Sequence, residues 1–137
     1  MNYIDAITLR IGRRLPLILQ TEATECGLAC LAMIAGYHGH HTTLMELRRQ
    51  FSVSLKGVTL KQLTQTADQL KFGTRAMRVE LEDLSKLTLP CVLHWDFNHF
   101  VVLKVADGRC LTLHDPAHGI RQLSLDEASK SFTGVAL

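Results

Sequence analysis

Cys26, His99 and Asp115 are residues whose types suit nucleophilic catalysis, and they occur in that order along the chain. Cys26 opens an apolar run with helical spacing, so its thiol is expected at a helix N-terminus. There the positive end of the helix dipole favours the thiolate, which is the reactive form of cysteine. A nucleophilic thiolate also needs an imidazole beside it and a group that orients this imidazole. His99 and Asp115 can supply these two roles, provided that the fold brings them to Cys26.

Residues 99–105 and 110–115 have the composition of two adjacent strands, and the turn between them decides whether His99 meets Asp115. A turn of three residues with a left-handed Gly108 would pair Val105 with Arg109 and place His99 directly opposite Asp115. A slip of one residue would mix apolar and polar side chains on both faces, so we expect the three-residue turn. One face then collects Val101, Leu103, Val105, Leu111 and Leu113, and the other carries Lys104, Cys110, Thr112 and His114.

The sequence also allows other roles for these histidines, aspartates and cysteines. A histidine opposite an aspartate on paired strands is often an ordinary polar pair, and His94 is a rival base, whereas His114 faces away and His118 follows the strand. Cys26 and Cys30 have neither the two-residue separation of redox motifs nor two further ligands for zinc. We therefore expect no metal site, with Cys30 in the core. The remaining cysteines and histidines also lack ligand spacing: Cys91, Cys110, His38, His40 and His41.

The order of secondary structure predicts an α+β fold, with N-terminal helices packed on a C-terminal antiparallel sheet. Three helices are expected at 26–37, 42–51 and 58–72, the first capped by Thr24 and ended by Gly36 or Gly39. The second half predicts a strand at 74–79 and a short helix at 81–87. A three-stranded meander is expected to follow at 91–95, 99–105 and 110–115.

The length, composition and net charge of the chain limit the classes of protein to consider. A chain of 137 residues with 47% hydrophobic and 20% charged residues is expected to form one folded domain, residues 1–137. The net charge of +2 is too small to indicate nucleic-acid binding. No apolar run approaches the roughly 20 residues that span a bilayer, and charged residues interrupt the N-terminus where a secretory signal would be apolar. We therefore expect a cytosolic domain with four free thiols.

Three sequence blocks carry a family resemblance. They are "QTEATECGLACLAMIAGYHG", "LPCVLHWDFNHFVVL" and "LHDPAHGIRQLSLDEASKSFTGVAL", with a looser match at "GVTLKQLTQTADQLKFGTRA" between them. Together they resemble the papain-like, double-glycine leader peptidase domain of bacteriocin ABC exporters of the colicin V type. The resemblance covers essentially the whole chain, and the blocks are specific in combination.

The resemblance implies roles for four residues. Cys26 would be the nucleophile, His99 the general base and acid, and Asp115 the carboxylate that orients His99. Gln20 would donate to the oxyanion beside the Cys26 backbone N–H, a contribution of roughly 3 kcal/mol in such sites. Glu25 departs from the family, which usually has aspartate before the cysteine.

The implied function is a cysteine endopeptidase that cuts a bacteriocin-type precursor after Gly-Gly, in concert with export. No cofactor is expected for this domain. ATP, the transmembrane spans and a location at the bacterial inner membrane would belong to a longer ABC transporter, of which this chain would be the N-terminal part. Two alternatives stay open: a module that docks the leader without cutting it, as in cysteine-less relatives, and a papain-like amidase or transferase.

Overall fold

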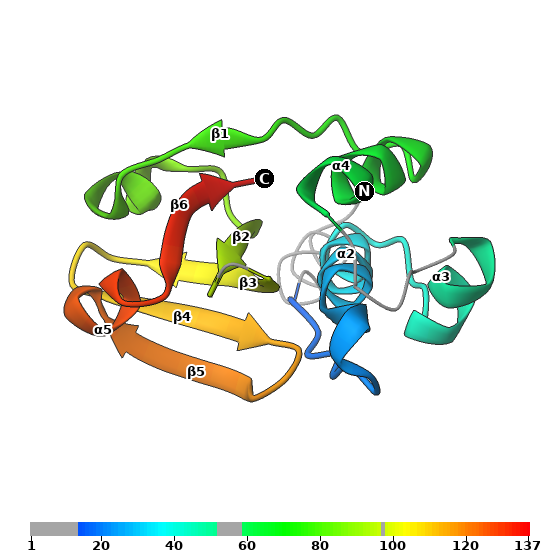
Figure 1. Ribbon diagram of the computed structural model, residues 1–137, viewed down its shortest axis with the longest axis horizontal. Coiled ribbons are helices and arrows are strands. Elements are labelled where there is room, and N and C mark those ends of the chain that lie inside the picture. The colour runs from blue at the N-terminus through cyan, green and yellow to red at the C-terminus, as the bar shows by residue number, and fades with distance from the viewer. Residues whose placement is uncertain (1–13, 52–58, 97) are drawn as a thin grey trace, which may run out of the picture.

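The computed structural model describes residues 14–51, 59–96 and 98–137, and in Figure 1 helices cluster beside a twisted sheet. Most of the N-terminal stretch that we judged unlike a secretory signal lies outside the described residues. The helical elements are the 3₁₀ turn η1 (Ala23–Glu25), α2 (Cys26–Tyr37), α3 (Leu44–Gln50), α4 (Leu60–Gln69), the 3₁₀ helix η2 (Leu81–Lys86) and α5 (Leu125–Ser129). The strands are β1 (Met77–Arg78), β2 (Cys91–Trp95), β3 (His99–Ala106), β4 (Cys110–Asp115), β5 (Gly119–Ser124) and β6 (Phe132–Ala136).

The three N-terminal helices form where their patterns predict them. Thr43 and Thr59 cap α3 and α4, because each side chain accepts a hydrogen bond from the backbone three residues on. The expectation that Thr24 caps α2 is wrong, since Thr24 lies inside η1 and Glu25 occupies the cap position. The N-terminal end of the predicted helix 58–72 includes Val58, which lies outside the described residues.

The sheet is antiparallel, with strand order β1-β6-β2-β3-β4-β5. This confirms the predicted meander β2-β3-β4 and the α+β class. Local sequence patterns do not predict β5, α5 or β6, and the strand expected at 74–79 is only two residues long. Its neighbour β6 is the last strand of the chain yet lies between β1 and β2, a non-local pairing that local patterns do not reveal.

The predicted register of β3 and β4 is wrong by two residues near His99. Val102 pairs with His114, so His99 is offset diagonally from Asp115 instead of lying directly opposite it. Gly108 is left-handed as expected, with φ of 87°, but Asp107 accepts two backbone hydrogen bonds and holds a wider turn. The register also shifts between Leu103 and Val105. Such a bulge reverses the faces beyond it, which explains why Val105 is 45% exposed although it was expected in the core.

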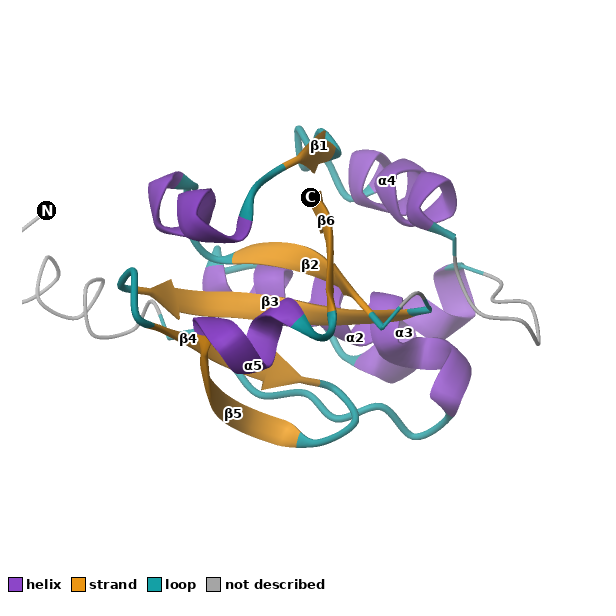
Figure 2. Ribbon diagram, turned by 60° about the vertical axis from the view of Figure 1, so that its left-hand side comes forward, coloured by secondary structure: helices purple, strands orange, loops and turns teal. Residues whose placement is uncertain are grey.

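Each face of the sheet has its own core. In Figure 2, α2 lies behind the sheet and α5 in front of it. The core on the α2 side joins this helix to α3, α4 and the inner side chains Phe100 and Val102. The core on the α5 side contains four of the five residues predicted to share a face: Val101, Leu103, Leu111 and Leu113. A register error of two residues preserves the face of each side chain, so the predicted core is largely correct.

Close packing at the far end of α2 requires a glycine. A Cβ built on Gly36 would lie 2.9 Å from Cγ of Pro16, in the segment that crosses this helix. Pro16 is held there because its carbonyl accepts a hydrogen bond of 3.0 Å from Nδ1 of the buried His114 on β4. The N-terminal segment, α2 and the sheet are therefore fixed to one another at this end.

Gly36→Ala is expected to destabilise the domain, although alanine favours helices by about 1 kcal/mol over glycine. The added methyl group would push against the Pro16 ring, and such overpacking costs about 1–3 kcal/mol. Thermal unfolding should show a lower Tm. Gly73→Ala is the matched control, because in the described part of the chain no atom beyond its two sequence neighbours lies within 4 Å of a Cβ at Gly73. Equal Tm values for the two variants would contradict the packing argument.

Candidate active site

The thiol of Cys26 lies at the first residue of α2, at the end of the helix that faces the start of β3. Cys26 is 5% exposed, and its Sγ lies 4.0 Å from the carbonyl oxygen of Asn98. His99 lies close enough to this thiol for Cys26 to help raise the pKa of the histidine. The helix N-terminus and the adjacent imidazole both favour negative charge on sulfur.

His99 and Asp115 meet across the ends of β3 and β4. The His99 Nε2 atom lies 2.7 Å from Asp115 Oδ1, and the aspartate side chain is 1% exposed. Burial would lower the pKa of His99, but hydrogen bonds with Asp115 and Cys26 outweigh burial and raise it to about 9. The imidazole is therefore cationic near neutral pH, with Nε2–H donating to the carboxylate. This arrangement leaves Nδ1 for the side of the thiol.

The Asp115 carboxylate has further partners that keep it ionised. Its Oδ1 accepts the Ala117 backbone N–H at 2.8 Å, and its Oδ2 lies 3.4 Å from the Arg121 guanidinium on β5. Burial would raise the pKa of Asp115, yet the hydrogen bonds from His99 and Ala117 lower it. Arg121 is not predictable from local sequence patterns, because they do not indicate β5 and the contact depends on the β4–β5 hairpin.

Gln20 lies beside this group, attached through its backbone. Its backbone N–H donates to the Pro116 carbonyl at 2.9 Å, directly after Asp115. The Oε1 atom of Gln20 is buried without a hydrogen-bond partner among the described residues. The structure thus brings together Cys26, His99 and Asp115, and places Gln20 next to them. The role of Gln20 as an oxyanion donor stays a prediction.

The other histidines have other side-chain surroundings, although the backbone N–H of His118 donates to the Asp115 carbonyl at 3.2 Å. His94 pairs with Phe100 in the β2–β3 ladder, and the centroids of these two rings lie 5.2 Å apart. His94 Nδ1 lies 2.8 Å from the Thr133 hydroxyl, which removes it as a rival base. The exposed end of α2 carries three further histidines, as expected: His38, His40 and His41.

The remaining thiols are free and not part of this group. Burial raises the pKa of Cys30 well above its ordinary value and raises that of Cys91 to about 12. Cys30 is fully buried, in agreement with a core role, and Cys110 is partly exposed. In the described part of the chain, no group of three or more His, Cys, Asp or Glu side chains is arranged to hold a metal ion.

Comparison with known proteins gives the same family over nearly the whole chain. The profile of the Peptidase C39 family matches residues 14–137. The colicin V secretion/processing ATP-binding protein of Escherichia coli is 52% identical over 134 residues, which are 98% of this chain and 19% of that protein. The transport/processing ATP-binding protein ComA of Streptococcus pneumoniae is 31% identical over 126 residues, 86% of this chain and 18% of its own length. The chain therefore spans about a fifth of these curated relatives.

Solved structures share the fold. A double glycine motif protease from an AMS/PCAT transporter, in complex with its leader peptide, superposes with a TM-score of 0.83 at 38% identity. The match covers 90% of this chain and 89% of that protease. The peptidase domain of Streptococcus ComA gives a TM-score of 0.81 at 25% identity, covering 90% and 96% of the two chains. These matches confirm the papain-like α+β fold that the resemblance implied.

In the described ranges no helix is both long and apolar enough to cross a bilayer.

Iodoacetamide is expected to alkylate Cys26 before the other three cysteines. Only Cys26 adjoins an imidazolium at a helix N-terminus, whereas Cys30 and Cys91 have raised pKa values because they are buried. Peptide mapping by mass spectrometry at neutral pH measures the four rates. His99→Ala should slow the alkylation of Cys26 and leave that of Cys110 unchanged. Labelling of Cys110 as fast as Cys26 would argue against an activated thiol.

The imidazolium of His99 is expected to persist up to about pH 9, as followed by NMR titration of its ring protons. Since its pKa is raised in the folded state, the pair stabilises the fold below the ordinary value of 6.5, and this contribution is lost as pH rises through about 9. Asp115→Asn should lower the pKa of His99, because the negative partner is gone. Asp126→Asn on the exposed face of α5 is the control. An unchanged His99 titration in Asp115→Asn would contradict the pairing.

Proposed function

The chain belongs to the peptidase C39 family of cysteine peptidases, and from this we propose that it cleaves the double-glycine leader of a bacteriocin-type precursor peptide. The observation that supports this function most directly is the proximity of Cys26 to His99, whose Nε2 lies 2.7 Å from Asp115 Oδ1. The same three side chains in this arrangement suit acyl transfer from a peptide bond.

In the first half-reaction, the Cys26 thiolate attacks the carbonyl carbon of the second leader glycine. The carbonyl electron pair moves to oxygen, and the resulting oxyanion is stabilised by the Cys26 backbone N–H and the Gln20 side-chain amide. The C–N bond then breaks, and the His99 imidazolium donates its Nδ1 proton to the leaving amine. The leader remains attached to sulfur as a thioester, and the peptide to be exported leaves.

In the second half-reaction, His99 acts as the base. It takes a proton from water while the water oxygen attacks the thioester carbonyl, so that the C–S bond breaks and the leader carboxylate is released. Asp115 remains ionised throughout and holds the imidazole in the orientation that serves both steps. Arg121 supports this role because its positive charge lies near the second carboxylate oxygen.

The proposal extends to the parent protein. Because the similar proteins of Escherichia coli and Streptococcus pneumoniae carry transport and ATP-binding in their names, we place this chain in an ABC exporter with transmembrane and ATPase domains. Residues 1–137 would form its single peptidase domain on the cytoplasmic side of the inner membrane. No cofactor is assigned to this domain, and ATP would act at the ATPase domain.

Leader recognition would combine two features of the substrate. Cleavage after Gly-Gly requires a cleft at Cys26 too narrow for a side chain at either of the last two leader positions. Upstream, an amphipathic leader helix would bind an apolar groove away from the scissile bond. The solved protease from an AMS/PCAT transporter holds a leader peptide, which supports binding of this class of ligand.

The domain is expected to cleave a precursor peptide of the colicin V class once, after Gly-Gly, as detected by mass spectrometry of both products. Cys26→Ala should lower the rate by at least about 10³-fold while still binding the precursor, because only the nucleophile is removed. Replacing the second glycine of the precursor by valine should abolish cleavage and leave leader binding intact.

Two outcomes would contradict this function. Binding of the precursor by the wild-type domain without any cleavage would indicate a docking module. Cleavage by Cys26→Ala at the wild-type rate would exclude the thiol mechanism. Rapid hydrolysis of a simple acyl amide, with no cleavage of the precursor, would instead favour an amidase.

A further inference from the structure

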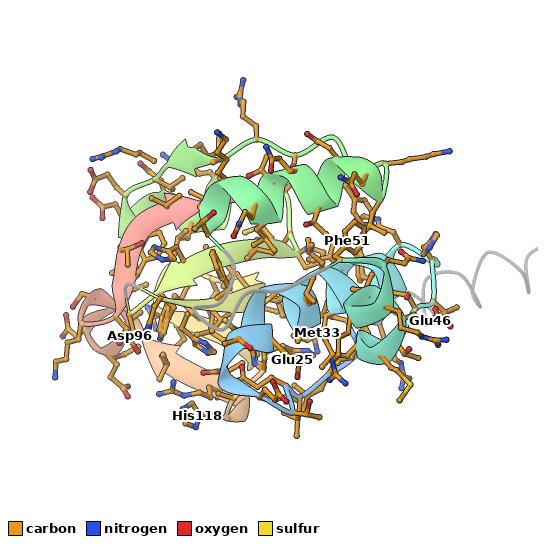
Figure 3. The ribbon with its side chains drawn as sticks, turned by 45° about the vertical axis from the view of Figure 1, so that its right-hand side comes forward. Glu25, Met33, Glu46, Phe51, Asp96 and His118 are labelled. Atoms are coloured by element: carbon orange, nitrogen blue, oxygen red, sulfur yellow. The ribbon has the colours of Figure 1, made fainter. Side chains whose placement is uncertain are left out.

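A buried carboxylate lies one residue before Cys26. Glu25 is 3% exposed, and its Oε1 accepts hydrogen bonds from the backbone N–H groups of Thr21 and Glu22 at 3.2 and 2.9 Å. The Thr21 hydroxyl donates to the same oxygen. Figure 3 shows Glu25 at the start of α2, on the side of the helix where α3 carries Glu46. One carboxylate oxygen thus holds the segment that directly follows Gln20.

Arg48 on α3 completes the arrangement. Its Nε donates to Glu25 Oε2, and its Nη2 donates to the Thr21 hydroxyl at 2.8 Å. Burial would raise the pKa of Glu25, but the hydrogen bonds from Arg48 and Thr21 outweigh burial and lower it. The carboxylate is therefore charged, and Arg48 balances a negative charge that would otherwise disfavour a thiolate at the next residue. We refer to Thr21, Glu25 and Arg48 together as the clamp.

We propose that the clamp positions the oxyanion hole, by fixing Gln20 relative to the backbone N–H of Cys26. This inference rests on the proposed function. Arg48 and Glu25 are positioning residues, since neither adjoins the reacting atoms in the mechanism above. The clamp fixes both ends of the short segment 20–26 at once, because Thr21 follows Gln20 and Glu25 precedes Cys26.

Gln20 depends on this positioning because of the state of its side-chain oxygen. Its Oε1 has no hydrogen-bond partner in the described part of the chain, so no polar side-chain contact there orients the amide through its oxygen. The direction of the side chain must then come from its backbone and from packing. The backbone is anchored on one side by the hydrogen bond to Pro116 and on the other by the clamp at Thr21. Loss of the clamp leaves the first anchor alone.

The charge and the geometry of the Arg48 side chain both contribute to the clamp. Its guanidinium is planar and presents several donors in a fixed arrangement, so one side chain reaches Glu25 and the Thr21 hydroxyl together. A lysine retains the positive charge but offers a single ammonium group. The side chain of Arg49, the next residue, is exposed and forms no hydrogen bond or ion pair within residues 14–51, 59–96 and 98–137. It provides a matched control of equal charge on the same helix.

The first experiment measures precursor cleavage by Arg48→Ala, Arg48→Lys and Arg49→Ala. Misplacement of a positioned donor by a fraction of an ångström to 1 Å costs about 10- to 100-fold in rate. We expect Arg48→Ala to lower kcat by about this factor with KM nearly unchanged, Arg48→Lys to restore part of it, and Arg49→Ala to match wild type. Circular dichroism and thermal unfolding select the conditions under which every variant is folded. Equal kcat for Arg48→Ala and Arg49→Ala would overturn the inference.

A double-mutant cycle distinguishes an effect of Arg48 through Gln20 from a loss of activity that does not involve Gln20. Gln20→Ala should cost about 10²- to 10³-fold in kcat, the usual cost of a lost oxyanion donor. If Arg48 acts through Gln20, the double variant Gln20→Ala, Arg48→Ala is expected to be little worse than Gln20→Ala alone. If the fold-loss of kcat in the double variant equalled the product of the two single losses, the inference would be overturned.

The test also distinguishes this inference from the proposed function. A wild-type domain that fails to cleave the precursor would remove the function, whatever the clamp does. A wild-type domain that cleaves, with Arg48→Ala cleaving equally well, would remove only the role of the clamp. Thr21→Val gives an independent check, because it deletes the hydroxyl and leaves both charges in place. We expect a smaller loss of kcat than in Arg48→Ala, again with KM nearly unchanged.

Discussion

The hydrogen-bonded pair of His99 and Asp115 sets the strictest demand on this structure. A buried carboxylate is costly unless its charge is balanced and its oxygens accept hydrogen bonds. Here Asp115 is 1% exposed, and three separate elements provide for it: the imidazole at the start of β3, the backbone of the following turn, and a guanidinium on β5. The β3–β4–β5 meander must close in one register for these partners to coincide. The fold of the sheet and the ionisation of the pair are therefore one constraint.

Helix α2 connects this pair to the other half of the molecule. Nine of its twelve residues are buried, because sheet, α3, α4 and the N-terminal segment surround it. Such a helix cannot shift along its axis without disturbing the core on that side of the sheet. Rigid packing thus fixes the position of the Cys26 thiol, and the helix dipole acts on it from the same direction. The proposed chemistry uses an apolar helix both as core and as electrostatic support.

The polar segment before α2 has a different kind of support. Residues 20–25 lack an apolar face of their own, so hydrogen bonds and one ion pair define their path. A buried carboxylate next to a proposed thiolate is unfavourable by itself, and Arg48 on α3 compensates for it. In this way α3, which is remote from the reacting groups in sequence, stabilises the site. The sheet, α2 and α3 thus each contribute residues to the same small region.

The sequence alone determined the residue types, the three N-terminal helices, the central meander and the faces of its strands up to the bulge after Leu103, because these depend on local periodicity and caps. The family blocks singled out Cys26, His99, Asp115 and Gln20. Only the tertiary structure decided the register, since the Asp107 side chain and a bulge after Leu103 override the simplest turn. It also decided the place of β6 inside the sheet and the contacts of Arg121 and Arg48. The place of β6 and these two contacts depend on pairing between segments that are distant in sequence. Such pairing becomes favourable only when the core has brought the segments together.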